Sequence, residues 1–124
     1  MPARMPHPIA LLPQAVKPIQ EVYAAALVGG VPPSTLALAH MRASQINGCS
    51  FCVASGFSNG RQAGESDERL LAVSAWRDTE VFNEAERAAL ALTECVTRLA
   101  DCSDPVPDAI WNEAARHYDA KGLA

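Results

Sequence analysis

The chain has 124 residues, a length that predicts one domain, and its 49% hydrophobic and 19% charged residues exclude a disordered chain. A net charge of −4 excludes the basic surface that nucleic acids and anionic membranes attract, and no nonpolar run is long enough to span a bilayer. The segment 1–13 holds four prolines and no continuous nonpolar stretch, so we expect no signal peptide and a cytoplasmic location.

Helices are predicted along the whole chain, because alanine is abundant and few segments alternate nonpolar with polar residues. The first helix is expected over Pro13–Val28, before two glycines that end it. A proline of the segment 31–33 can begin the second helix, which runs to about Ile46, where Asn47-Gly48 breaks it. The nonpolar stripe predicted for this helix is Leu36, Ala39, Ala43 and Ile46.

Three further helices are predicted from shorter sequence patterns. One begins at Cys49 and ends near Ala63, and the next has Ser66 as its cap and carries Trp76. The last follows the stiff segment 104–107, which contains two prolines.

The fifth helix has the clearest pattern. Asn83 and Glu86 form a predicted capping box, and Glu94 is expected to pair with Arg98 on the solvent side. Its predicted nonpolar stripe is Ala85, Ala88, Ala89, Leu92, Val96 and Leu99. The fold class is therefore all-α, a bundle of about six short helices over residues 1–124, and its thin core predicts a homo-oligomer.

Reactive chemistry is concentrated in Cys49-Ser50-Phe51-Cys52, a Cys-x-x-Cys motif at the start of a predicted helix. Unpaired N–H groups and the positive end of the helix dipole favour a thiolate there. Residues three apart on a helix have β-carbons about 5–6 Å apart, and a disulfide brings them to about 3.8 Å. A small adjustment would join the two sulfurs, so the motif indicates a redox-active dithiol.

Three other interpretations of this pair stay open. A zinc site needs two more ligands, and Cys95 and Cys102 lack the matching spacing. A permanent disulfide would close too small a loop to stabilise the fold much. The third alternative is two buried, unreactive cysteines. We expect no metal, and we expect Cys95 and Cys102 to pack in the core without a redox role.

Two segments resemble a known family. Residues 42–52, RASQINGCSFC, and 62–94, QAGESDERLLAVSAWRDTEVFNEAERAALALTE, are similar to the carboxymuconolactone decarboxylase superfamily, and more closely to its alkylhydroperoxidase D-like branch. The resemblance runs from about Met5 to Lys121 and implies an all-helical fold that assembles as trimers or hexamers. The decarboxylase branch generally lacks the cysteine pair, which argues against lactone decarboxylation here.

The resemblance also implies a reaction. In this branch the second cysteine, here Cys52, attacks a hydroperoxide, and the first, here Cys49, resolves the sulfenic acid as a disulfide. A dihydrolipoyl protein re-reduces the pair, so the Cys49–Cys52 disulfide is the only redox group expected and no separate cofactor is implied.

Two positions depart from the peroxidase pattern. The branch has a glutamate where this chain has Ala37, and a histidine where it has Gly56; together these groups activate the thiol. His40 lies one turn from Ala37 and faces roughly the same way, so it is a candidate proton relay, with an exposed surface histidine as the alternative. Arg42 matches the family pattern and would act either beside Cys49 or on a carboxylate.

Glycines recur on the predicted third helix. Gly56, Gly60 and Gly64 follow Cys52 at intervals of four residues, and each interior glycine weakens a helix by about 1 kcal/mol relative to alanine. The stripe indicates either close packing of a neighbouring helix or a groove leading to Cys52.

The leading functional hypothesis is a thiol-dependent peroxidase or disulfide oxidoreductase acting through Cys49 and Cys52. Its expected partners are a small hydroperoxide and a dithiol reductant. The alternative is a non-enzymatic helical oligomer that serves as a redox sensor or binding protein, which the missing relay residues keep open.

Overall fold

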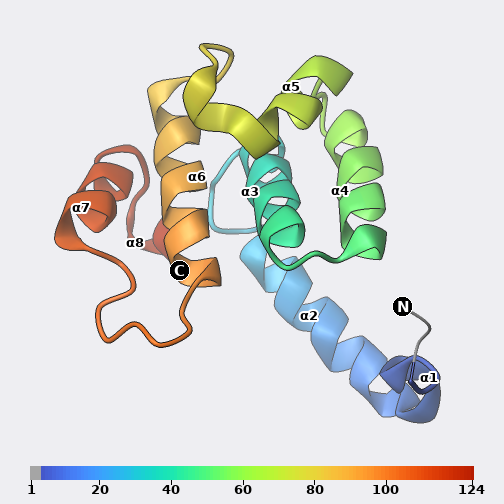
Figure 1. Cartoon of the computed structure of the whole chain (residues 1–124). Coiled ribbons are helices and arrows are strands. Elements are labelled where there is room, and N and C mark those ends of the chain that lie inside the picture. Colours follow the sequence, from blue (N-terminus) through green and yellow to red (C-terminus); the bar gives the residue numbers. More distant parts are fainter. Residues whose placement is uncertain (1–3) are drawn as a thin grey trace.

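Four helices lie side by side in the order α4, α3, α6 and α7, as Figure 1 shows for the computed structural model, which describes residues 4–124. A short helix α5 and a 3-10 segment η2 cross one end of this row, and α1 and α2 project away from it. The elements are α1 (Pro8–Leu11), η1 (Pro13–Ala15), α2 (Val16–Ala26), α3 (Pro33–Ile46), α4 (Ser50–Gln62), α5 (Asp67–Ala72), η2 (Val73–Asp78), α6 (Glu84–Thr97), α7 (Asp108–His117) and α8 (Ala120–Leu123). Within residues 4–124 there is no strand, so the predicted all-α class is confirmed.

Local sequence signals set several helix ends as expected. The Asn83 side chain accepts the Glu86 N–H at 2.9 Å, and the Glu86 carboxylate accepts the Asn83 N–H at 2.9 Å, so the capping box is confirmed. Ser66 caps α5 by accepting the N–H of Arg69, and Pro33 begins α3. After α3, Gly48 adopts a φ of 64°, a conformation that glycine tolerates and that stops the helix.

The N-terminal prediction was only partly right. A single helix over 13–28 is replaced by η1 and α2, and α1 precedes them unpredicted, with His7 capping it through its ring nitrogen. The expected fourth helix is divided into α5 and η2, and the nonhelical φ of −123° at Ala75 bends η2 just before Trp76. Residues 1–3, the start of the proline-rich segment, lie outside the described part.

The core lies where α3, α5, η2 and α6 meet. Its buried side chains are Leu38, Met41, Leu70, Val73, Trp76, Phe82 and Leu90. The stripe predicted for α3 was wrong: its buried residues are Thr35, Leu38, Met41 and Ser44, whereas Leu36, Ala39, Ala43 and Ile46 are only half-buried. The reason is that α3 packs against α4 on one side and α6 on the other, so its deepest line runs between the two contacts.

The register predicted for α6 was also partly wrong. Glu94 does pair with Arg98, at 3.2 Å, but its carboxylate is buried instead of facing solvent. Val96 and Leu99, which were expected on the buried stripe, are about half exposed. None of the helices in the described part of the chain is both long enough and nonpolar enough to cross a membrane.

Candidate redox site

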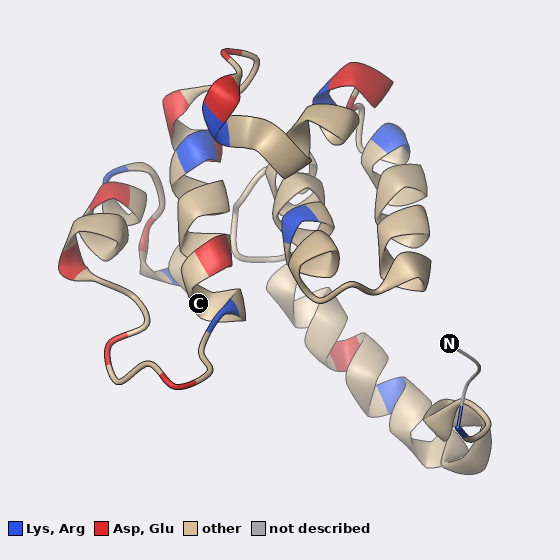
Figure 2. Cartoon of the chain, viewed as in Figure 1, with Lys and Arg blue, Asp and Glu red and all other residues tan. Residues whose placement is uncertain are grey.

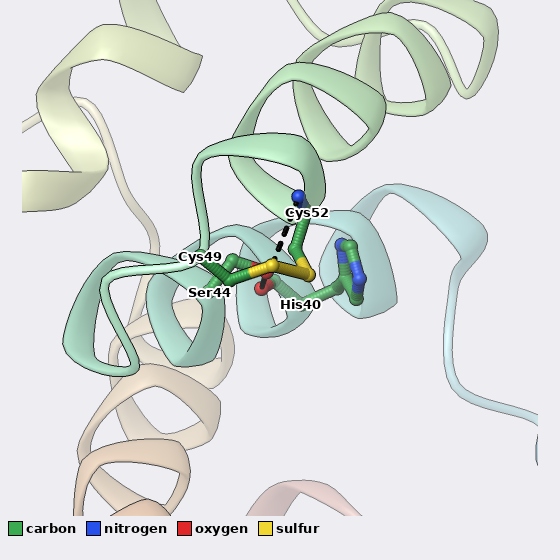
Figure 3. The surroundings of a disulfide bond; sticks show 4 residues. All are labelled: His40, Ser44, Cys49 and Cys52. Carbon is green, nitrogen blue, oxygen red and sulfur yellow. Dashed lines mark hydrogen bonds between the residues drawn. A yellow bond between two sulfur atoms is a disulfide. The ribbon is translucent and has the colours of Figure 1, made fainter. Parts of the chain in front are cut away.

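A disulfide joins Cys49 and Cys52 at the start of α4, with their α-carbons 5.2 Å apart (Figure 3). The helix begins at Ser50, one residue later than predicted, because Cys49 is the N-cap. Its sulfur accepts the N–H of Cys52 at 3.2 Å, one of the backbone donors that the first turn of a helix leaves unpaired. The sequence therefore places one sulfur directly at the positive end of the helix, where negative charge is stabilised.

The disulfide lies near the surface. Both cysteines are half-buried, and Phe51, between them in the sequence, is 78% exposed. Because both cysteines are half-buried and joined as a disulfide, the alternative of two buried free thiols is wrong. Among residues 4–124, no three His, Cys, Asp or Glu side chains come together as a metal site would require.

The other two cysteines are free thiols. Cys95 is half-buried on α6, but Cys102 is exposed, so the expectation that it packs in the core was wrong. The reason is that α6 ends at Thr97, and Cys102 lies in the long connecting segment between α6 and α7.

His40 enters the site from the neighbouring helix α3. A β-carbon at Gly56 would lie 2.9 Å from Nδ1 of His40, closer than nonbonded atoms approach, so the imidazole lies directly on this glycine. Gly56 is one turn beyond Cys52 on the same face of α4. Figure 3 shows the ring beside the disulfide, on the side of Cys52. His40 is half-buried, which removes the alternative of a fully exposed surface histidine.

Ala37, His40 and Gly56 line one pocket of about 220 Å³ between α2, α3 and α4. The two positions where the chain departs from the peroxidase pattern therefore meet in space, although 19 residues separate them in the sequence. The imidazole of His40 reaches this meeting point from α3, and the sequence indicated only that it shared a face with Ala37. What the sequence could not show is that α3 and α4 pack with Gly56 under the ring.

Gly60 has a different surrounding from Gly56. A β-carbon there would lie 2.6 Å from Cδ2 of Leu70, a side chain that is 1% exposed. The stripe of glycines therefore does not form a continuous groove: its part at Gly60 is filled by close packing of α5 on α4, and only Gly56 borders the pocket.

Arg42 contacts a carboxylate and not the sulfurs. Its Nε donates to Glu94 at 2.7 Å, and Nη1 donates to Gln45 at 3.3 Å. Ser44 donates its hydroxyl to the backbone oxygen of His40 at 2.7 Å. Arg42 thus ties α3 to α6 behind the site, whereas the bond of Ser44 lies within α3.

The surroundings of the disulfide carry little charge. Figure 2 shows no blue or red residue in the first turns of α4, and the first charged residue of that helix is Arg61, which pairs with Asp67 at 3.2 Å. The groups that favour a thiolate here are therefore the backbone N–H groups of the helix start rather than a neighbouring cation.

Comparison with known proteins identifies the relatives of this arrangement. Residues 13–94, which include both cysteines and His40, match the carboxymuconolactone decarboxylase family. The chain belongs to this family.

Two uncharacterized proteins are among those similar to this chain. YdfG of Bacillus subtilis strain 168 is 30% identical over 109 residues, which cover 88% of this chain and 73% of YdfG. YnjA of Escherichia coli K12 is 36% identical over 93 residues, which cover 73% of this chain and 48% of YnjA, so the chain matches about half the length of that relative.

A solved structure places the chain more closely within the family. The crystal structure of ATU0492 from Agrobacterium tumefaciens superimposes with a TM-score of 0.87 at 28% identity, over 98% of this chain and 82% of that one. ATU0492 is a protein of unknown function for which an AhpD role in antioxidant defence has been suggested. The predicted alkylhydroperoxidase D-like (AhpD-like) branch is thereby confirmed.

Proposed function

We propose that the chain is an AhpD-like thiol oxidoreductase that reduces hydroperoxides through Cys49 and Cys52. The observation that carries the proposal is the surface-accessible disulfide at the start of α4 with the ring of His40 beside it. The likeness to ATU0492 supports an antioxidant role.

In the proposed reaction Cys52 provides the attacking sulfur. His40 takes the proton of the Cys52 thiol, and the thiolate attacks the terminal oxygen of the hydroperoxide, so that the O–O bond breaks. The imidazolium returns the proton to the leaving alkoxide and an alcohol is released. The Cys49 thiol then condenses with the sulfenic acid, which forms the disulfide and one water. An external dithiol reduces the disulfide by exchange and is itself oxidised.

The geometry supports these roles in two ways. Cys52 lies on the side of the disulfide that faces His40, so the proton acceptor is next to the sulfur that must lose its proton. Cys49 sits at the helix cap, where the N–H of Cys52 stabilises it as the thiolate that exchange with a reductant releases. A dihydrolipoyl protein in the cytoplasm is the proposed reductant, as the family resemblance implies.

A non-enzymatic redox sensor is the second candidate, and one observation favours it: Ala37 and Gly56 leave the family relay without its glutamate and histidine. A sensor would form the same disulfide but would not turn over with a dithiol.

The experiment starts from reduced protein and one equivalent of hydrogen peroxide, followed by mass spectrometry. We expect fast formation of the Cys49–Cys52 disulfide, a trapped sulfenic acid at Cys52 in Cys49→Ser, and no sulfenic acid in Cys52→Ser. Steady turnover with dihydrolipoamide supports the peroxidase over the sensor.

His40→Gln tests the proton relay, since glutamine keeps the polarity but cannot take up the proton. We expect disulfide formation to slow by about 100-fold. His117→Gln, on α7, is the matched control. If hydrogen peroxide oxidises the native protein no faster than it oxidises free cysteine in solution, the peroxidase proposal is ruled out.

A further inference from the structure

We propose that the pocket bounded by Ala37, His40 and Gly56 binds the nonpolar body of an uncharged organic substrate and presents its reactive group to Cys52. The predicted effect on reaction rates rests on the proposed thiol chemistry, whereas the predicted binding of the ligand does not. It assigns a specificity site to the two positions where the chain has lost the family's relay side chains.

The composition of the pocket wall defines the ligand class. Tyr23 and Leu27 of α2 and Leu36 and Ala37 of α3 supply nonpolar surface, and Asn59 and Gln62 of α4 supply amides at one side. No Lys, Arg, Asp or Glu lines the pocket. Burial of a carboxylate or an ammonium without a partner is costly, so the site selects a neutral molecule.

The size of the pocket limits the ligand further. Its volume is about 220 Å³, whereas a dry nonpolar cavity of about 150 Å³ is enough to hold one benzene ring. The pocket therefore has room for one aromatic ring with a short branch. A long acyl chain does not fit inside it.

The small residues at two positions create this space. A longer side chain at position 37 would extend into the pocket, and one at position 56 would meet the ring of His40 at its β-carbon. The pocket follows α4 from Gly56 toward Ala63, away from the disulfide.

His40 lines the pocket, and its ring lies beside the disulfide on the side of Cys52 (Figure 3). In the described part of the chain its imidazole nitrogens have no hydrogen-bond partner, since only its backbone oxygen is bonded, by Ser44. A ligand with its ring in the pocket therefore places its polar end against this imidazole. For a hydroperoxide, that orientation directs the O–O bond toward the Cys52 sulfur.

The binding experiment uses the oxidised protein and 2-phenyl-2-propanol, an alcohol that cannot oxidise a thiol. In an NMR titration we expect amide shifts at Gly56, Asn59 and Gln62. Ala37→Leu, which fills the pocket, should weaken binding by about tenfold or more. Ala54→Leu is the matched control because residue 54 is on the exposed face of α4. Ala63→Leu fills the far end and serves as the second variant should Ala37→Leu fail to fold.

The kinetic experiment compares cumene hydroperoxide with hydrogen peroxide on the reduced protein. We expect Ala37→Leu to slow disulfide formation by cumene hydroperoxide about tenfold more than it slows disulfide formation by hydrogen peroxide.

The outcomes separate the two proposals. If hydrogen peroxide forms no disulfide, the proposed function is wrong. The titration with the alcohol then still shows whether the pocket binds an uncharged organic molecule. If the alcohol shifts no pocket residue, or if Ala37→Leu slows both peroxides equally, the pocket inference is overturned. It is also overturned if the same amides shift only with protein concentration, because a second copy of the chain then occupies the site.

Discussion

The Glu94 carboxylate accepts four hydrogen bonds from side chains. One carboxylate oxygen accepts Arg42 at 2.7 Å and Trp76 at 3.0 Å, and the other accepts Arg77 at 2.7 Å and Arg98 at 3.2 Å. Burial alone would raise the pKa of Glu94, but the hydrogen bonds from Trp76, Arg77 and Arg42 and the charge of Arg42 lower it to about 2. The ionised carboxylate therefore ties α3 and η2 to α6.

We predict that Glu94→Gln lowers the free energy of unfolding at neutral pH by about 3 kcal/mol, because three arginines lose their charged partner and one of them, Arg42, is itself largely buried. Since the pKa is depressed in the folded state from an ordinary 4.5 to about 2, this contribution is complete above pH 4.5 and disappears as the pH falls toward 2. Urea unfolding at a series of pH values should show the native protein and the variant converging in acid.

The control for this prediction is Glu113→Gln, whose carboxylate is 44% exposed and pairs with Arg116 at the surface. It should leave the unfolding curve nearly unchanged. A constant difference between the native protein and Glu94→Gln across the acid range would contradict the assignment.

The distance in sequence between two contacting residues explains which side-chain contacts the sequence could predict. Cys49 and Cys52 are three residues apart, and Glu94 and Arg98 are four apart, so helical geometry alone brings each pair together. Arg42 reaches Glu94 over 52 residues, and His40 reaches Gly56 between two helices. Such contacts follow from how whole helices pack, which a single sequence does not specify.

Close packing between α4 and α5 fixes the position of the cysteine-bearing helix. Gly60 allows Leu70 to approach the backbone of α4, and Leu70 belongs to the central core. The caps at Ser66 and Asn83 could be predicted because each needs only residues within one turn. The role of Gly60 could not, because close packing and an open groove give the same pattern of glycines.

We predict that Gly60→Ala destabilises the protein by about 1 kcal/mol: alanine favours the helix by about 1 kcal/mol, but the added methyl meets Leu70 in a full core, which costs more. The measurement is a double-mutant cycle by urea unfolding. In a Leu70→Ala background the same substitution should become stabilising, because the space is then free. Equal effects in both backgrounds would show that the two residues do not interact.

The arm that contains α1 and α2, residues 5–28, carries nine of the fourteen exposed large hydrophobic residues in the described part of the chain. It extends away from the helix row in Figure 1, and Figure 2 shows few charges along it. The exposed residues of α2 that share a hollow are Pro18, Ile19, Val22, Tyr23 and Ala26. A helix with an uncovered nonpolar face is stabilised mainly by a partner, so we propose that this face is covered in a homo-oligomer, a trimer or hexamer as the family resemblance implies.

We predict that Val22→Lys, at a position that is 72% exposed, shifts the protein to smaller species in sedimentation velocity, because the ammonium group cannot be buried in the contact. Gln20→Lys adds the same charge outside the nonpolar hollow and should leave the distribution unchanged. A native protein that sediments as a monomer at all concentrations would contradict the assembly.

The hydrogen bond from the Cys52 amide to the Cys49 sulfur has a consequence for a protein that gains and loses electrons repeatedly. Reduction removes a covalent link but leaves the same sulfur in place as the acceptor that starts α4, and a thiolate accepts such a bond more strongly than a disulfide does. The backbone at the start of α4 thus keeps this hydrogen bond in both chemical states. Cycling should require no refolding, and its speed should be limited by the encounter with small molecules and reductants.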